Sequence, residues 1–195
     1  HSYYSFHDGA SSLEELITQA KEFGYRALAV TDHGNLCGAM RFAHVSASLG
    51  IKGIIGAEIT LQGDYHLTLL TKDRQGYANL CRLITAAHNI GERNNPELPR
   101  EMLAEYSAGL IALSGCPRGE LSQLVSQERL SEARRLVYQY LDWFGKDNYF
   151  IELQQNLVYG DTERNRELIR LAKEVGAKVV ATGNVHYHIR ERRRL

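Results

Sequence analysis

This sequence of 195 residues contains few cysteines, lacks long apolar runs and has no formal net charge. Its three cysteines, Cys37, Cys81 and Cys116, are not closely spaced, which fits reduced thiols better than a disulfide framework. No stretch is long and apolar enough to span a membrane and no signal-peptide pattern opens the chain, so we expect a cytoplasmic protein without a membrane partner. The formal net charge is zero, which excludes a global electrostatic attraction to nucleic acid.

The end of the sequence is a local exception to this charge balance. Arg190, Arg192, Arg193 and Arg194 stand close together with only Glu191 among them. The run is either a phosphate-contacting tail or the solvated start of a helix, and the sequence leaves both interpretations open. Because the chain opens without methionine and stops inside this charged run, we expect it to be a fragment of a longer protein.

Proline is also rare, and it marks the one clear long loop. Two of the three prolines fall within Gly91 to Arg100, together with glycine and two asparagines. The whole chain has 44% apolar and 24% charged residues, which is ordinary for a globular protein. At this length we expect residues 1–195 to form a single domain of the α/β barrel or open-sheet type.

Apolar periodicity and turn residues predict strands that alternate with helices. The predicted strands cover residues 26–31, 51–60, 66–71, 110–114, 149–153 and 179–182. The predicted helices cover residues 13–23, 36–49, 76–90, 120–125, 131–144 and 162–175. Ser12 and Glu15 form a capping-box pattern at the start of the first helix. The alternation predicts parallel strand pairing with right-handed crossovers.

Side chains of the types that bind metal ions lie at or after the ends of the predicted strands, at the start of one strand (His66) or in the first loop. They are His1, Asp8, His33, Glu58, His66, Cys116, Asn184 and His186. The carboxyl ends of strands converge in a crevice in α/β folds, and imidazole, carboxylate and thiolate groups bind Zn, Mn or Fe there. Two or three clustered cations generate a nucleophile and neutralise a leaving oxygen, so this set predicts phosphoester hydrolysis.

Each of these residues also has an ordinary structural interpretation. A histidine after a strand is often a hydrogen-bonded loop residue, and Cys116 alone is typical of a small buried apolar side chain. Glu58 can cap a turn, and Asp32 can bond a backbone amide. What favours a metal site is the joint pattern of ligand-type residues at equivalent places in the fold.

Other polar residues are assigned supporting or structural roles. Asp32, within the run T-D-H-G-N, is expected to orient the loop behind His33, and Glu152 is expected to face inward and support the ligands from behind. His44 and His88 lie in helical patterns and are assigned to packing or surface. The roles of His7 and His188 stay open.

Several stretches of the sequence, taken in order along the chain, resemble the motifs of one protein family. They are H-S-Y-Y-S-F-H-D-G-A-S-S, A-V-T-D-H-G-N-L-C-G-A, I-I-G-A-E, H-L-T-L-L-T-K, G-L-I-A-L-S-G-C, Y-F-I-E-L-Q and V-V-A-T-G-N-V-H-Y. Together they resemble the PHP (polymerase and histidinol phosphatase) domain found at the amino terminus of bacterial DNA polymerase III α subunits. Residues 155–165 and the end of the chain resemble the error-prone branch of that family.

The resemblance implies a distorted seven-stranded β/α barrel, similar to a TIM barrel, with one to three divalent cations (Zn, Mn or Mg) at its carboxyl-end mouth. Carried over residue by residue, the implied ligands are His1 as the second histidine of an opening H-x-H, Asp8, His33, Glu58, His66, Cys116 and His186. The first histidine of the H-x-H is missing, and Asn184 stands where many members have aspartate. A neutral amide is a weaker ligand, so we expect fewer metals or a loss of catalysis.

Three functions follow from this resemblance. In the first, the parent protein is a DNA-directed DNA polymerase, a nucleotidyltransferase, and this domain hydrolyses phosphoesters, for instance as a 3′–5′ exonuclease. In the second, the domain is a structural platform. In both of these cases polymerase domains would follow Leu195, and the partners would be DNA, through the full-length polymerase, and other polymerase subunits. The alternative is a free-standing PHP phosphatase that acts on a small substrate such as histidinol phosphate.

Overall fold

A computed structural model describes residues 1–6, 8–92 and 95–193 of the chain. The strands are β1 (Ala27–Val30), β2 (Lys52–Leu61), β3 (Tyr65–Thr71), β4 (Leu110–Leu113), β5 (Tyr149–Gln154) and β6 (Lys178–Thr182). The helices are α1 (Leu13–Glu22), α2 (Ala39–Leu49), α3 (Arg74–Ile90), α4 (Met102–Tyr106), α5 (Glu120–Ser126), α6 (Leu130–Phe144), α7 (Asp161–Val175) and the 3-10 turn η1 (Arg190–Arg193). His7 and Arg194, and part of the predicted loop at 91–100, lie outside the described residues.

The strands form one sheet in the order β1-β2-β3-β4-β5-β6. The expected parallel pairing holds for β1 with β2, β4 with β5 and β5 with β6, but it is wrong for β3, which is antiparallel to both neighbours. The reason is the connection between β2 and β3, where Gly63 and Asp64 take positive φ values in a tight hairpin. A parallel crossover needs a dozen or more residues, so this short turn reverses the chain.

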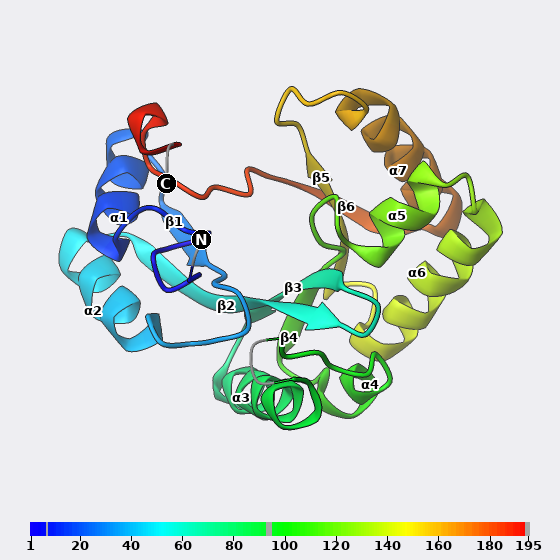
Figure 1. Cartoon of the computed structure of the whole chain (residues 1–195), viewed down its shortest axis with the longest axis horizontal. Coiled ribbons are helices and arrows are strands. Elements are labelled where there is room, and N and C mark those ends of the chain that lie inside the picture. Colours follow the sequence, from blue (N-terminus) through cyan, green and yellow to red (C-terminus); the bar gives the residue numbers. More distant parts are fainter. Residues whose placement is uncertain (7, 93–94, 194–195) are drawn as a thin grey trace.

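The sheet is curled, and the helices surround it on three sides in Figure 1, with α1 and α2 beside β1, α3 and α4 beneath, and α5 to α7 beside β5 and β6. Six strands are found among the described residues, where the resemblance implied seven. The α/β barrel-type class is confirmed, but β1 and β6 are not paired with each other, so the sheet is an open half-barrel. A cavity of about 440 Å³ lies between these two edges, and its walls include Leu28 and Val180.

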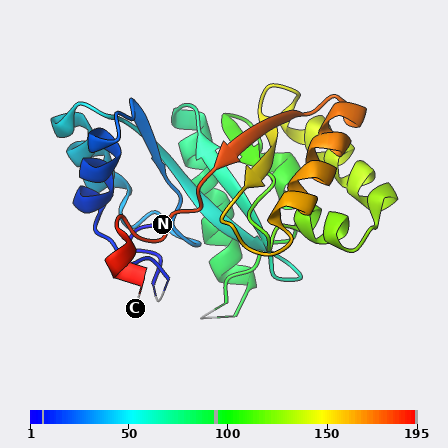
Figure 2. The same ribbon diagram turned by 90° about the horizontal axis from the view of Figure 1, so that it is seen from above.

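Two apolar cores hold the layers together. The larger core joins β2 to β5 with α3 to α7, and Leu69, Leu80 and Tyr149 are among its fully buried side chains. The smaller core packs α1 and α2 on β1 through Ile17 and Phe42. Figure 2 shows the start and the end of the chain close together beside the smaller core. No described helix has the length and apolar character needed to cross a membrane.

Most predicted helices are confirmed, with differences that have local causes. Helix α1 starts with the expected capping box, in which Ser12 and Glu15 bond each other's backbone amides. Helix α2 begins at Ala39, because the Asn35 side chain bonds the backbone of His33 and Cys37 and keeps that stretch in turns. The short helix α4 was not predicted. At the end of the chain, η1 is exposed and tied to α1 by an Arg192–Glu15 ion pair of 2.8 Å.

Candidate metal centre

The cluster begins where β1 ends, in the T-D-H-G-N turn. Beyond Val30 the chain stays beside β2, because His33 forms a parallel bridge with Glu58 and the amide of Gly34 donates to the Glu58 carbonyl at 2.8 Å. Gly34 has a φ of 56°, a left-handed conformation that glycine takes at little cost. The turn therefore places the side chains of His33 and Glu58 next to each other.

Glu58 lies at the buried centre of the cluster, with 3% of its surface exposed. Its Oε1 atom lies 3.0 Å from Nδ1 of His33 and 2.5 Å from Nδ1 of His66. Burial raises the pKa of Glu58, but the interactions with the two imidazoles outweigh burial and hold this pKa at about 2. The antiparallel direction of β3 explains the position of His66, because the start of β3 lies at the edge of the sheet where β2 and β4 end.

Cys116 extends the cluster from the end of β4. Its Sγ atom lies 3.4 Å from Nδ1 of His66, and Gly115, with a φ of 91°, makes the turn that brings it there. Burial, together with the nearby charge of Glu58, raises the pKa of the thiol to about 12. Without a cation beside it, Cys116 is therefore a neutral thiol at pH 7, and a bound divalent cation would favour its thiolate.

The opposite side of the cluster is built from the first loop and the segment after β6. Asp8 Oδ2 lies 2.6 Å from Nε2 of His33 and 3.1 Å from Nδ1 of His186. The ring of His1 stacks between His33 and His186, with centroid distances of 4.4 and 4.6 Å. Nε2 of His1 lies 3.2 Å from Oδ1 of Asn184, whose φ is 47°.

The structure thus brings all eight sequence-predicted ligand residues into one continuous cluster. Two groups in it have ligand atoms within 4.8 Å of one another, namely His1, His33 and Glu58, and Glu58, His66 and Cys116. Glu58 belongs to both groups. The residues fit a divalent cation, because the buried atoms Oε1 of Glu58 and Nδ1 of His186 have no hydrogen-bond partner of good geometry although ligand atoms surround them.

Asp32 lies behind the cluster and contacts the first loop. Its buried carboxylate accepts hydrogen bonds from the amide and hydroxyl of Ser2 at 2.6 and 2.8 Å and from the hydroxyl of Ser5 at 2.8 Å. Ser5 Oγ in turn accepts from the amide of His33 at 3.1 Å and lies 3.2 Å from Nδ1 of His1. Ser2 and Ser5 were missed from the sequence, although the S-Y-Y-S spacing directly after His1 is a signal for them.

Glu152 faces the interior of the half-barrel, where it is buried. It accepts from the amide of Gly115 at 3.2 Å and from Gln154 at 2.9 Å, and it also bonds Thr182. Burial raises the pKa of its carboxyl group. Glu152 therefore reaches the cluster indirectly, through the backbone turn that positions Cys116.

The other histidines that the structure describes, His44, His88 and His188, lie outside the cluster. His44 is exposed on α2, and His88 bonds the Gly34 carbonyl at 2.8 Å, which ties α3 to the T-D-H-G-N turn. His188, whose role was open, bonds Ser11 Oγ at 2.8 Å and holds the end of the chain against α1.

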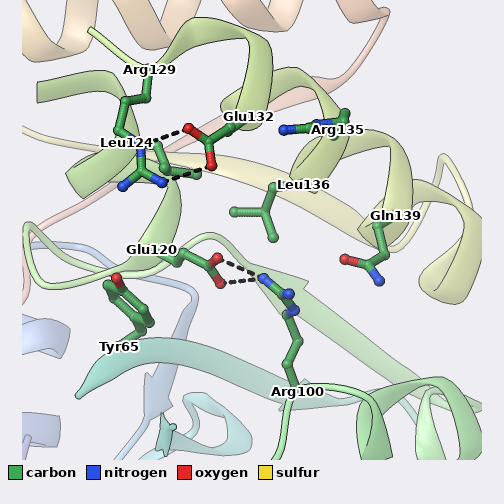
Figure 3. Close-up of a pocket in the computed structure, with 9 residues that line it drawn as sticks. All are labelled: Tyr65, Arg100, Glu120, Leu124, Arg129, Glu132, Arg135, Leu136 and Gln139. Carbon is green, nitrogen blue, oxygen red and sulfur yellow. Dashed lines mark hydrogen bonds and ion pairs between the residues drawn. The ribbon is translucent and has the colours of Figure 1, made fainter. Parts of the chain in front are cut away.

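A second cavity, of about 480 Å³, lies outside the half-barrel beside α5 and α6 (Figure 3). Arg100 pairs there with Glu120 at 2.6 Å, and Arg129 pairs with Glu132 at 2.7 Å. These pairs neutralise most of the charge in the cavity. It contains none of the ligand-type clusters found at the sheet edge, so the candidate site is the one centred on Glu58.

Fold and site together define a class: α/β proteins of the barrel type with a histidine, carboxylate and thiol cluster where the strands end. The chain belongs to the PHP domain family, whose model matches residues 1–156. It is 43% identical to an error-prone DNA polymerase of Symbiobacterium thermophilum over 98% of the chain, and 41% identical to a DNA polymerase III subunit alpha of Treponema pallidum over 96%. The chain spans 19% and 17% of the length of these two relatives.

Solved structures share the fold at low sequence identity. An amidohydrolase from Chromobacterium violaceum has a TM-score of 0.62 at 17% identity, covering 94% of this chain and 85% of that one. A two-domain protein from Bacteroides vulgatus, described as containing a predicted PHP-like metal-dependent phosphoesterase, has a TM-score of 0.60 at 14% identity, covering 96% of this chain and 51% of that one. These likenesses establish the architecture.

Proposed function

We propose that residues 1–195 are the PHP domain of a longer DNA-directed DNA polymerase of the III α type, closest to the error-prone branch. The observation that carries this proposal is identity above 40% over nearly the whole chain to two such polymerases. On this proposal, the domain meets DNA and other polymerase subunits through the full-length protein, in the cytoplasm. Sequencing the parent gene past Leu195 tests it, because a short downstream region without polymerase-type carboxylates supports a free-standing phosphatase instead.

We further propose that the cluster binds divalent cations at two neighbouring positions that share Glu58. The shared Oε1 atom supports this arrangement, since it faces His33 on one side and His66 on the other. His1 completes the first position and Cys116 the second. The mixture of imidazole, carboxylate and thiol suits Zn or Mn better than Mg, which prefers oxygen ligands.

Such a centre supports phosphoester hydrolysis at its open side. Bound cations would supply activation of a water molecule and neutralisation of phosphate charge. Glu58 and His66 are buried and hold the inner side, whereas the Asp8 side chain is 45% exposed and lies where a substrate enters. Asp32 and Ser5 keep His1 and His33 in place, which fixes the geometry on that side.

Metal content and hydrolysis are measured together on the chain and on Glu58→Gln. We expect about two equivalents of Mn or Zn in the unaltered chain and loss of both in the variant, because the shared carboxylate becomes a neutral amide, which is a weaker ligand. Cleavage of a single-stranded oligonucleotide and of a simple aryl phosphodiester is then followed. Glu97→Gln, a change outside the cluster, is the control. A chain that binds no more metal than Glu58→Gln overturns the metal centre, whereas metal binding without cleavage overturns hydrolysis alone.

A structural role is the second candidate function, and Asn184 favours it. This neutral side chain bonds His1, while Asp8 contacts His186, so the cluster ties the first loop to the segment after β6. In that case cations stabilise the domain without cleaving any substrate. The expected result is a lower melting temperature after chelation, together with no nuclease activity in any metal.

The domain itself is proposed to be larger by one strand. The resemblance implies seven strands, and the open seam between β1 and β6 is the place that fits the seventh. Apolar side chains line the seam, including Leu28, Phe150 and Val180. A strand pairing with both edges would close the half-barrel and cover this surface.

A further inference from the structure

The loop between β5 and α7 exposes three large apolar side chains in a row. Leu157 is 91% exposed, Val158 63% and Tyr159 103%. A single exposed apolar side chain is common on protein surfaces, but a continuous group is typical of an interaction site. Figure 1 shows this loop standing clear of the helices at the top of the molecule.

The loop is fixed from beneath by Asp161, which begins α7 and is buried. Its Oδ2 atom accepts from the amides of Asn156 at 2.8 Å and Val158 at 3.1 Å, and its Oδ1 atom pairs with Arg164 at 2.7 Å. Leu157 takes a φ of 59°, a left-handed conformation that costs an L-amino acid free energy. A fixed backbone that holds apolar side chains outward is preorganised for binding.

The composition of the loop indicates the kind of partner. Residues 155–160 read Q-N-L-V-Y-G and contain no charged side chain. A nucleic-acid strand is held largely through cations that contact its phosphates, and this loop has none. Leucine and valine are instead suited to an apolar pocket on a folded polypeptide.

The chain spans 19% and 17% of the two polymerase relatives named above, so most of a polypeptide of that kind lies outside residues 1–195. We propose that Leu157, Val158 and Tyr159 form a docking loop that inserts into an apolar pocket on the remaining part of the same polymerase polypeptide. This inference rests on the proposal that the chain is part of such a polymerase. It does not depend on metal binding or on hydrolysis.

Cysteine labelling compares the docking loop in the isolated chain and in the full-length polymerase. Tyr159→Cys is made in a Cys37→Ser background, which removes the exposed native thiol, and the rate of maleimide labelling is measured in both proteins. We expect labelling to be at least about tenfold slower in the full-length protein, because docking limits access to transient openings. Met40→Cys, at an exposed position on α2, is the matched control and should label at equal rates in both.

The outcomes separate this inference from the proposed function. Equal rates for Tyr159→Cys in the two proteins, with the polymerase intact and active, overturn the docking loop and leave the polymerase assignment standing. Protection that appears only after single-stranded DNA is added also overturns it, since the occupant is then nucleic acid. A parent gene that encodes no further polypeptide overturns the polymerase assignment first.

Discussion

At the scale of single residues, Ser5 connects the buried acid of the first loop to the ligands. Its hydroxyl donates to Asp32, accepts from the amide of His33 and contacts His1. Serine is a common loop residue, and its spacing after His1 was the only signal in the sequence that this hydroxyl links two other residues. The sequence analysis assigned Asp32 a supporting role behind His33, and in the structure its carboxylate bonds Ser2 and Ser5.

Ser5→Ala is expected to weaken metal binding by about tenfold or more, since the orientation of two ligands relaxes. The buried Asp32 also loses a donor, which should lower the free energy of unfolding by about 1 to 3 kcal/mol. Isothermal titration with Zn and chemical denaturation measure the two effects. Ser48→Ala removes an exposed hydroxyl on α2 and should change neither. Unchanged affinity in Ser5→Ala would show that His1 and His33 are positioned without it.

Metal affinity should fall as pH decreases through the raised pKa of His33. Burial lowers this pKa, but the carboxylates of Glu58 and Asp8 outweigh burial and raise it above 6.5. A cation must displace the His33 proton, so affinity is highest above the raised pKa and declines below it. Glu58, with a pKa of about 2, stays ionised and does not limit binding in this range. Titrations with Mn between about pH 5 and pH 8 test the trend, and a flat profile contradicts it.

At the scale of elements, the hairpin between β2 and β3 decides where His66 lies. Gly63 has a φ of 91° and Asp64 a φ of 63°, and the reversal places the start of β3 at the edge where β2 meets His33. The strand itself was readable from its apolar residues. Its direction was missed because strands alternate with helices elsewhere in the chain, and parallel pairing was therefore expected for every pair of neighbouring strands.

Gly63→Ala tests the role of this turn. An alanine there should cost about 1 to 2 kcal/mol of stability, because an L-residue resists the left-handed conformation. It should also weaken metal binding, since its Cβ would meet the Tyr65 ring beside His66. Gly24→Ala, at a φ of 77° with open space around its Cβ, should lose similar stability and keep full affinity. Equal affinities in the two variants would exclude a link between the turn and the site.

At the scale of the whole molecule, the cluster joins segments that are distant in sequence. It receives side chains from the first loop, from the ends of β1 and β4, from β2 and β3, and from the segment after β6. A cation that binds only the folded arrangement stabilises all of these connections together. The same reasoning applies to the seam between β1 and β6, where an added strand would join the two ends of the sheet.

Removing the metal should lower the melting temperature of the chain. At a free cation concentration of about 100 times Kd, binding stabilises the folded chain by about 2.7 kcal/mol. For a domain of this size, each kcal/mol of stability shifts the melting temperature by about 2 to 4 °C. Calorimetry with and without a chelator measures the difference. Glu58→Gln is the control and should show no further decrease on chelation. A chelator effect of equal size in both proteins would place the stabilising cation elsewhere.

Extending the chain upstream with the residues of its parent gene should raise the melting temperature. A strand of about 5 or 6 residues would cover the apolar side chains at the seam, including Leu28 and Val180. An extension of the same composition in scrambled order is the control. If the native and scrambled extensions melt at the same temperature, the seventh strand does not occupy the seam.

The sequence by itself determined the class of fold and predicted which residue types would gather at the candidate site. Apolar period and capping residues are local signals, so the strands and most helices were predicted without coordinates. The eight candidate ligands were predicted from their residue types near strand ends and from the family resemblance. The tertiary structure decided which of them meet. The sharing of Glu58 by His33 and His66, the reversed β3, the open seam and the outward Leu157–Tyr159 loop depend on how distant segments pack. Contacts between distant segments produce no periodic pattern in a single sequence, so they could not be predicted from it.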